Sequence, residues 1–201
     1  MDALEAISTR RSLRHFDARP IPRPTLHQLL YVGCLAPAPH HTRPWRFVVL
    51  ESTDSRRRLA SAMGAAWRRD LEGDRVAQER IETLLARSRR QIEDAPALIL
   101  ACLVADGLRA WPDERRQRAE RGMALQSMGC ALENIMVAAR AEGLASFWIS
   151  APLFCQPEVR GALDLRRDYE AQALIAVGYP AADSPPRHRA EPDLPNMTTT
   201  R

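Results

Sequence analysis

Apolar residues recur at helical spacing in two short segments near the start of the chain. Leu4 and Ile7 fall on one face of a first helix, and Thr25 is placed to cap a second helix that runs through Val32. Apolar runs beside proline or glycine predict four strands, over residues 45–51, 97–104, 144–149 and 171–177. Further helices are predicted from about residue 54, over 81–93, over 113–142 and over 157–163.

The order of these elements predicts the fold class. Strands alternate with helices, which favours an α+β or α/β fold with a small central sheet under many helices. The helix over 113–142 carries a wide apolar stripe that either faces the core or contributes to a dimer interface. With 201 residues, 45% of them hydrophobic, the chain is expected to form one domain, and five prolines are expected to keep its tail at 180–201 extended.

Composition excludes several classes of protein. All 29 basic residues are arginine, so chemistry that needs a lysine is ruled out. A net charge of +4 would suit nucleic acid, but most arginines alternate with acids, as in 113–121, and the scattered aromatic residues form no platform for bases. The longest apolar run is too short to span a bilayer, and the acidic start lacks the features of a secretory signal. We therefore expect a cytoplasmic protein with no membrane or nucleic-acid partner.

The cysteines and histidines give no sign of a metal site. The four cysteines are widely spaced, without a C-x-x-C pair, and are expected to be reduced thiols in or near the core. His40 and His41 are adjacent, so their side chains point to different sides of an extended loop, and no second ligand pair follows at zinc spacing. No metal is expected.

Residues 10–14 are the most informative segment of the chain. Arg10, Arg11, Ser12, Leu13 and Arg14 bring three guanidinium groups and a hydroxyl together, a combination that suits a phosphate group. The glycine-rich dinucleotide motif, the P-loop and the serine-hydrolase elbow are all absent from the sequence. A pairing of Cys155 with a histidine stays open as a nucleophile, although a lone cysteine after an apolar strand is usually structural. The chemistry is better assigned to a cofactor.

Three segments in order resemble the FMN-dependent nitroreductase superfamily. They read Arg-Arg-Ser-Leu-Arg-His-Phe at 10–16, Pro-Ala-Pro-His-His-Thr-Arg-Pro-Trp-Arg-Phe at 37–47, and Glu-Gly-Leu-Ala-Ser-Phe-Trp-Ile-Ser at 142–150. The resemblance covers essentially the whole chain. It implies a single FMN-binding domain over 1–201 with a nitroreductase-like α+β fold, in which helices flank a small mixed sheet of about four or five strands. It also implies a homodimer that exchanges the extended tail at 180–201 and holds FMN between its subunits.

The resemblance also assigns roles to residues. Arg10, Ser12 and Arg14, with Leu13 between them, would bind the FMN phosphate and ribityl chain, while Arg11 either joins them or faces solvent. The remaining contacts implied for FMN are Ala38, Pro39 and His41 along the ring, the amides of Ser150 and Ala151 near N5, and Arg187 and Arg189 on the phosphate. Catalysis would then rest on the flavin rather than on a side chain. His41 either donates a proton or is a loop histidine hydrogen-bonded to backbone.

The individual residues in these segments narrow the resemblance to one type of protein within the superfamily. Family members commonly carry Asn and Gln before Pro-Trp, where this chain has His41 and Arg43. The segments 36–44, 67–71 and 154–155 are similar to the C-terminal domain of the bifunctional coenzyme F420 biosynthesis protein. That similarity implies a free-standing reductase that passes hydride from reduced FMN to dehydro-F420-0, with Asp70 contacting this deazaflavin acceptor. Alternatively, Asp70 is an ion-pair partner of Arg75 or simply an acid on the helix surface.

Two other functions stay open at this point. One is a general nitro or quinone reductase that uses NAD(P)H. The other is a non-catalytic FMN- or F420-binding protein.

Overall fold

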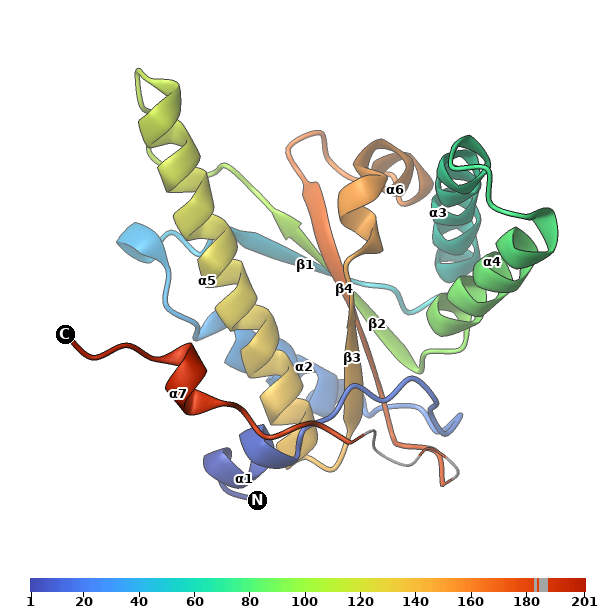
Figure 1. Cartoon of the computed structure of the whole chain (residues 1–201), viewed down its shortest axis with the longest axis horizontal. Coiled ribbons are helices and arrows are strands. Elements are labelled where there is room, and N and C mark those ends of the chain that lie inside the picture. The colour runs from blue at the N-terminus through green and yellow to red at the C-terminus, as the bar shows by residue number, and fades with distance from the viewer. Residues whose placement is uncertain (183, 185–187) are drawn as a thin grey trace.

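A central sheet between two helical layers organises the computed structural model, which describes residues 1–182, 184 and 188–201 (Figure 1). The strands are β1 (Trp45–Val49), β2 (Ala97–Leu103), β3 (Ala145–Ile149) and β4 (Glu170–Gly178). The helices are α1 (Ala3–Thr9), α2 (Arg23–Cys34), α3 (Thr53–Gly73), α4 (Gln78–Glu93), α5 (Glu114–Ala141), α6 (Gln156–Ala162) and α7 (Leu194–Met197), with 3-10 turns η1 (Pro39–His41) and η2 (Ala151–Phe154).

The four strands pair in the order β1-β2-β4-β3, and each neighbouring pair is antiparallel. The expected α+β fold with a small central sheet is thus confirmed, but the expectation of mixed pairing within the sheet was wrong, because local apolar patterns do not encode strand direction. A parallel bridge between Ser12 and Ser146 places the arginine-rich segment beside edge strand β3. The amide of Leu13 donates to the Ser146 carbonyl at 3.2 Å, so this segment is fixed by backbone contacts.

Each face of the sheet is covered by its own helices. On one face, α2 and α5 pack through residues such as Leu29, Leu132 and Ile135, all with no exposed surface. On the other face, α3, α4 and α6 contribute Leu59, Ile92 and Val159 to a second cluster. Because β2 is covered on both sides, all seven of its residues are buried, which explains its unbroken apolar run.

Several local expectations need correction. Helix α2 begins at Arg23, before the cap expected at Thr25, because Pro24 fits the first turn, where no amide is needed. The tail is not wholly extended, since Asp193 accepts a hydrogen bond from the Asn196 amide and caps the one-turn helix α7. Cys102 and Cys155 are buried, but Cys130 is exposed on α5 rather than in the core.

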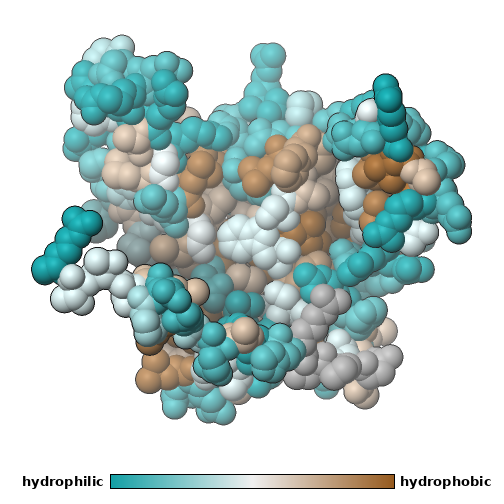
Figure 2. Space-filling model, in the orientation of Figure 1, coloured by the Kyte–Doolittle hydropathy of each residue, from teal (hydrophilic) through white to brown (hydrophobic). Residues whose placement is uncertain are grey.

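The apolar stripe expected on α5 is divided between core and surface. Met128, Leu132, Ile135, Met136 and Ala139 are buried, whereas Met123 and Leu125 are 40% and 36% exposed. In Figure 2, apolar surface shows at the lower left, where α1 lies, and on the right around α3 and α4. No helix within residues 1–182 and 188–201 is long and apolar enough to cross a membrane.

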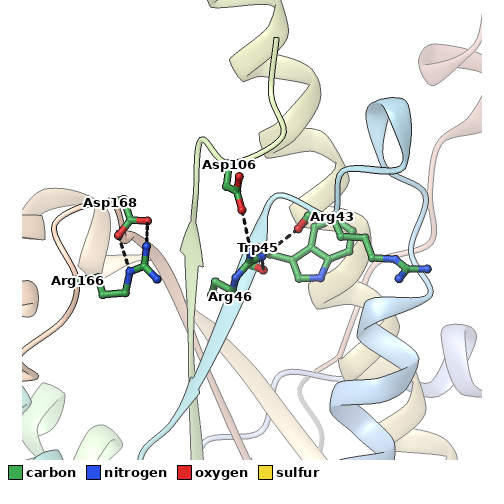
Figure 3. Close-up of polar contacts among 6 residues, drawn as sticks. All are labelled: Arg43, Trp45, Arg46, Asp106, Arg166 and Asp168. Carbon is green, nitrogen blue, oxygen red and sulfur yellow. Dashed lines mark hydrogen bonds and ion pairs between the residues drawn. The ribbon is translucent and has the colours of Figure 1, made fainter. Parts of the chain in front are cut away.

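Ion pairs hold the loops at one end of the sheet (Figure 3). Arg46 of β1 donates to the carbonyls of Arg43 and Trp45 and lies 3.5 Å from the Asp106 carboxylate. Nearby, Arg166 makes two hydrogen bonds to Asp168, which hold the pKa of that carboxyl below its usual range. These charges are exposed, so each pair contributes little to stability, but together they fix the entry into β1.

Candidate functional site

Three arginines converge at the end of α1. Arg11 Nη1 and Arg189 Nη2 each donate to the Ser8 carbonyl oxygen at 2.8 Å, although Arg189 comes from the distant tail. Arg10 lies in the same segment, and its Nε is 3.2 Å from Glu133 Oε1 on α5. We call Arg10, Arg11 and Arg189 the Ser8 arginine cluster. Arg187, also expected on the phosphate, lies outside the described residues.

The chemistry of the Ser8 arginine cluster suits a phosphate monoester. Arg10 pairs with Glu133, whereas neither Arg11 nor Arg189 makes an ion pair with a described residue, so net positive charge is left at this cluster. Each guanidinium also has five N–H donors, and the contacts to Ser8, Arg10 and Glu133 engage few of them. Arg11 is therefore a member of the cluster rather than a purely solvent-facing residue.

Two adjacent cavities lie between the arginine-rich segment and the α3–α4 pair. The smaller, of about 560 Å³, and the larger, of about 870 Å³, share Arg14, Arg87 and Gln91 in their walls, so they form one groove. Ser12, Leu13 and Arg14 line the larger cavity. Arg14, Asp70 and Ala151 line the smaller cavity, so the fold brings together residues far apart in the sequence.

The smaller cavity has mainly apolar walls. Trp67 of α3 and Ile149 of β3 line it, together with Phe154 of η2, whose side chain is 82% exposed. Cys155 also lines it, and burial raises the pKa of this thiol to about 11, with the nearby carboxylates of Glu158 and Asp70 acting in the same direction. A neutral thiol is a poor nucleophile, and no histidine is among the described residues that line this cavity. The Cys155–histidine alternative therefore has no support.

Aromatic packing fixes Arg14 at the centre of the groove. Its guanidinium carbon lies 5.4 Å from the centre of the Phe147 ring, which stacks on Phe16 at 6.1 Å. Phe147 is a buried residue of β3, and Phe16 is held beside Pro180 by a backbone bridge. The position of Arg14 therefore follows from the sheet edge and not from a flexible loop.

The proline-rich loop is anchored to the other end of α5. His40, His41 and Arg43 all have positive φ, of 53°, 56° and 49°, which is uncommon for residues other than glycine. His40 Nε2 is 3.8 Å from Glu120 Oε1, and Glu120 is only 1% exposed. Its carboxylate accepts hydrogen bonds from Trp111 Nε1 and the Arg109 amide, which lower its pKa.

One chain does not bring this loop to the groove. Glu120 and Glu133, which contact His40 and Arg10, are separated by about 20 Å along the axis of α5 at the usual rise per residue. Figure 1 shows the pale-blue turn of η1 beside the upper half of α5 and α1 beside its lower end. Neither cavity wall includes Ala38, Pro39 or His41. Ser150 lies between the end of β3 and η2, just before Ala151, and is exposed.

Comparison with protein-family models decides the family. The nitroreductase family model matches residues 7–179, which include the arginine-rich segment, all four strands and both cavity-lining helices. The chain belongs to the nitroreductase family. Among curated relatives, it is 26% identical over 190 residues to iodotyrosine deiodinase of Danio rerio, a match that covers 89% of this chain. The match spans only 60% of the length of that relative.

Solved structures of this family share the fold. A nitroreductase with bound FMN from Bacteroides fragilis superposes with a TM-score of 0.74 at 22% identity, covering 100% of this chain and 99% of that one. The NADPH:FMN oxidoreductase of Vibrio harveyi, solved with NAD⁺, gives a TM-score of 0.72 at 17% identity and covers 99% and 77%.

The sequence did not single out two residues of the groove, and the burial of Glu120 at the other end of α5 was not predicted from it. Arg87 and Arg90 of α4 line the groove, but in the sequence they look like the other surface arginines of charged helices. Glu120 was treated as part of a solvated helix face, yet it is buried. The position of Glu120 does partly indicate its burial, because it lies one turn before the apolar residue Ala124 on the stripe of α5.

Proposed function

We propose that this chain is an FMN-dependent oxidoreductase of the nitroreductase family that transfers hydride from reduced flavin to a small-molecule acceptor. The observation that carries the proposal is the Ser8 arginine cluster, a phosphate-sized concentration of positive charge at the start of the segment that lines the groove. The FMN in the Bacteroides fragilis relative and in the name of the Vibrio harveyi enzyme supports the choice of flavin.

The residues present fit FMN from one end to the other. The Ser8 arginine cluster would bind its phosphate, Ser12 and Arg14 its ribityl oxygens, and the backbone at Ser150 and Ala151 the ring. When bound, FMN supplies hydride to the acceptor and is reduced again by an electron donor. The apolar wall around Trp67 would exclude water, and Arg14 would favour negative charge on the ring.

The working unit we propose is a homodimer with FMN between subunits. Ala38, Pro39 and His41 lie far from the groove of their own chain, and a second copy would supply them from its own loop. Apolar side chains are available for such an interface, since Leu4 is 79% exposed on α1 and Met197 is 71% exposed on α7. In the single chain, Arg189 of the tail contacts Ser8 of the same chain, so the Ser8 arginine cluster does not need an exchanged tail.

For the acceptor, we propose dehydro-F420-0, in which hydride and a proton add across one double bond. Asp70 supports this choice, because it lines the smaller cavity and makes no ion pair with Arg75 among the described residues. The alternative acceptor is a general nitro or quinone compound, with NAD(P)H as donor. The NADPH-dependent relative from Vibrio harveyi favours this alternative.

The visible spectrum of the purified protein tests the cofactor. We expect a yellow protein that releases FMN on denaturation. Arg189→Ala should weaken FMN binding at least about tenfold, because a charge-assisted contact to phosphate is lost. Arg23→Ala is the matched control, since Arg23 pairs with Glu51 away from the groove. A folded wild-type protein that neither contains nor binds FMN would refute the proposal.

Single-turnover mixing tests the acceptor. The FMN-loaded protein is reduced without air and mixed with dehydro-F420-0, menadione or a nitroaromatic compound, while the flavin absorbance is followed. Rapid oxidation by dehydro-F420-0, with the saturated product found by mass spectrometry, supports that acceptor. Oxidation only by menadione or the nitro compound would instead support the general reductase.

A further inference from the structure

Arg87 and Arg90 form a second group of arginines in the groove. They lie three residues apart on α4, so both point to the same side of that helix, and both line the larger cavity. Arg87 also lines the smaller, aromatic cavity beside Trp67. Among the described residues in the wall of the larger cavity, Asp94 supplies a carboxylate and His15 an imidazole, and Arg14 also lines this wall.

Two neighbouring arginines in this part of the fold, Arg68 and Arg89, are held by acids. Arg68 of α3 makes hydrogen bonds of 2.7 and 3.0 Å to both oxygens of Glu82 on α4, and Arg89 pairs with Glu93 at 2.8 Å. Among the described residues, neither Arg87 nor Arg90 makes an ion pair or a side-chain hydrogen bond. Asp70 shares the smaller cavity with Arg87, yet the two do not pair. These two guanidinium groups therefore keep their donors available to a ligand.

The FMN phosphate already has a separate group of arginines. The Ser8 arginine cluster is formed by the end of α1, the tail and Glu133 of α5, and α5 covers the first face of the sheet. Arg87 and Arg90 belong to α4, which packs on the opposite face. FMN has one phosphate group, so the second pair of arginines is available to another anionic ligand.

We propose that Arg87 and Arg90 bind an acidic substituent of the acceptor, whose aromatic part occupies the smaller cavity beside Trp67. This inference rests on the proposed function, and it narrows the substrate class to aromatic acceptors that carry a carboxylate, sulfonate or phosphate group. Arg87 joins the two halves of the site because it lines both cavities. The bidentate Arg68–Glu82 pair fixes the spacing of α3 and α4 around the ligand.

Two isosteric probes test this selectivity on the FMN-loaded protein. 4-Nitrobenzoate carries a negative charge, whereas 4-nitrobenzamide has the same shape and is neutral. Dissociation constants are measured by equilibrium dialysis with the oxidised protein. Reoxidation of the reduced protein is followed in parallel, each nitro group taking two electrons and two protons to give the nitroso compound and water.

We expect the wild type to prefer 4-nitrobenzoate, and Arg87→Gln/Arg90→Gln to weaken its binding about tenfold while 4-nitrobenzamide changes less than about twofold. Arg89→Gln is the matched control, because it removes one charge from the same helix outside both cavities. It should change neither probe.

Two results would overturn the inference. One is equal affinity of the wild type for both probes. The other is loss of FMN from the folded double variant, which would make these arginines the cofactor phosphate site. Flavin content on the same samples separates the two proposals, since a colourless protein that still prefers the carboxylate refutes FMN binding and supports the anion site.

Discussion

Gly178→Ala tests how tightly the sheet is coupled to the groove. Gly178 ends β4, and an added Cβ would lie 2.7 Å from Phe16 Cδ1 and 2.8 Å from Pro96 Cγ. Carbon atoms normally pack at about 3.5–4.0 Å, so either the Phe16 ring or the Pro96 ring has to move. Neither is the end of a flexible chain. Phe16 is the one tied to the site, because it lines the larger cavity and stacks on Phe147 under Arg14.

The expected cost follows from two opposing terms. Overpacking a fitted site costs about 1–3 kcal/mol. Replacing glycine by alanine stiffens the unfolded chain and returns about 0.4–1 kcal/mol. From the middle of each range, the net loss is about 1.3 kcal/mol, which for a chain of this size lowers Tm by roughly 3–5 °C. FMN affinity should fall as well, because Arg14 moves with the aromatic pair.

Thermal unfolding and urea unfolding of the cofactor-free protein measure the stability, and flavin titration measures the affinity. Gly64→Ala is the control, since nothing lies within 4 Å of its added Cβ in the middle of α3, and it should stabilise the protein by about 0.5–1 kcal/mol. In the double variant Phe16→Leu/Gly178→Ala the losses should be less than additive. An unchanged Tm in Gly178→Ala, or strict additivity with Phe16→Leu, would refute this reasoning.

Two further predictions concern buried titratable groups. In Glu120→Gln, urea unfolding at pH 7 should show a less stable protein, because the wild-type carboxylate has a lowered pKa and stabilises the fold at pH above the ordinary glutamate value. That difference should shrink as the pH falls below the ordinary glutamate pKa and acid protonates Glu120, and a difference that stays constant over this fall in pH would argue against it. With iodoacetamide at pH 8, peptide mapping should show Cys130 alkylated but Cys102 and Cys155 unmodified, because burial raises the pKa of those two thiols to about 12 and about 11. Rapid labelling of Cys155 would contradict its assigned burial.

Local signals in the sequence were sufficient for most element boundaries. Asp113 caps α5 through the Arg116 amide, and Gly143, with φ of 74°, ends the same helix. Both effects act within one helical turn, so they can be recognised without knowledge of the fold. The antiparallel pairing of the strands cannot, because it depends on the end of the sheet at which each connecting segment returns.

In the candidate site, too, some features follow from local sequence and others depend on the fold, as residues 10–14 show. Their arginines were predicted to bind phosphate from composition alone, and Arg10 and Arg11 do lie together. Their partnership with Arg189, about 180 residues later in the chain, arises because the tail passes Ser8. The resemblance also implied that Ala38, Pro39 and His41 lie beside the same ligand, whereas in one chain their loop is held near Glu120 through His40.

The absence of lysine makes pairing, rather than residue type, the criterion for a functional cation in this protein. Every basic side chain is a guanidinium group, so composition does not separate Arg87 from Arg68, and both lie on helices rich in acids. The structure separates them, because Arg68 is neutralised by Glu82 while Arg87 faces a cavity. An unpaired guanidinium in a groove wall keeps its donors and its charge for a ligand, and this is the physical reason to expect selectivity for an acidic acceptor here.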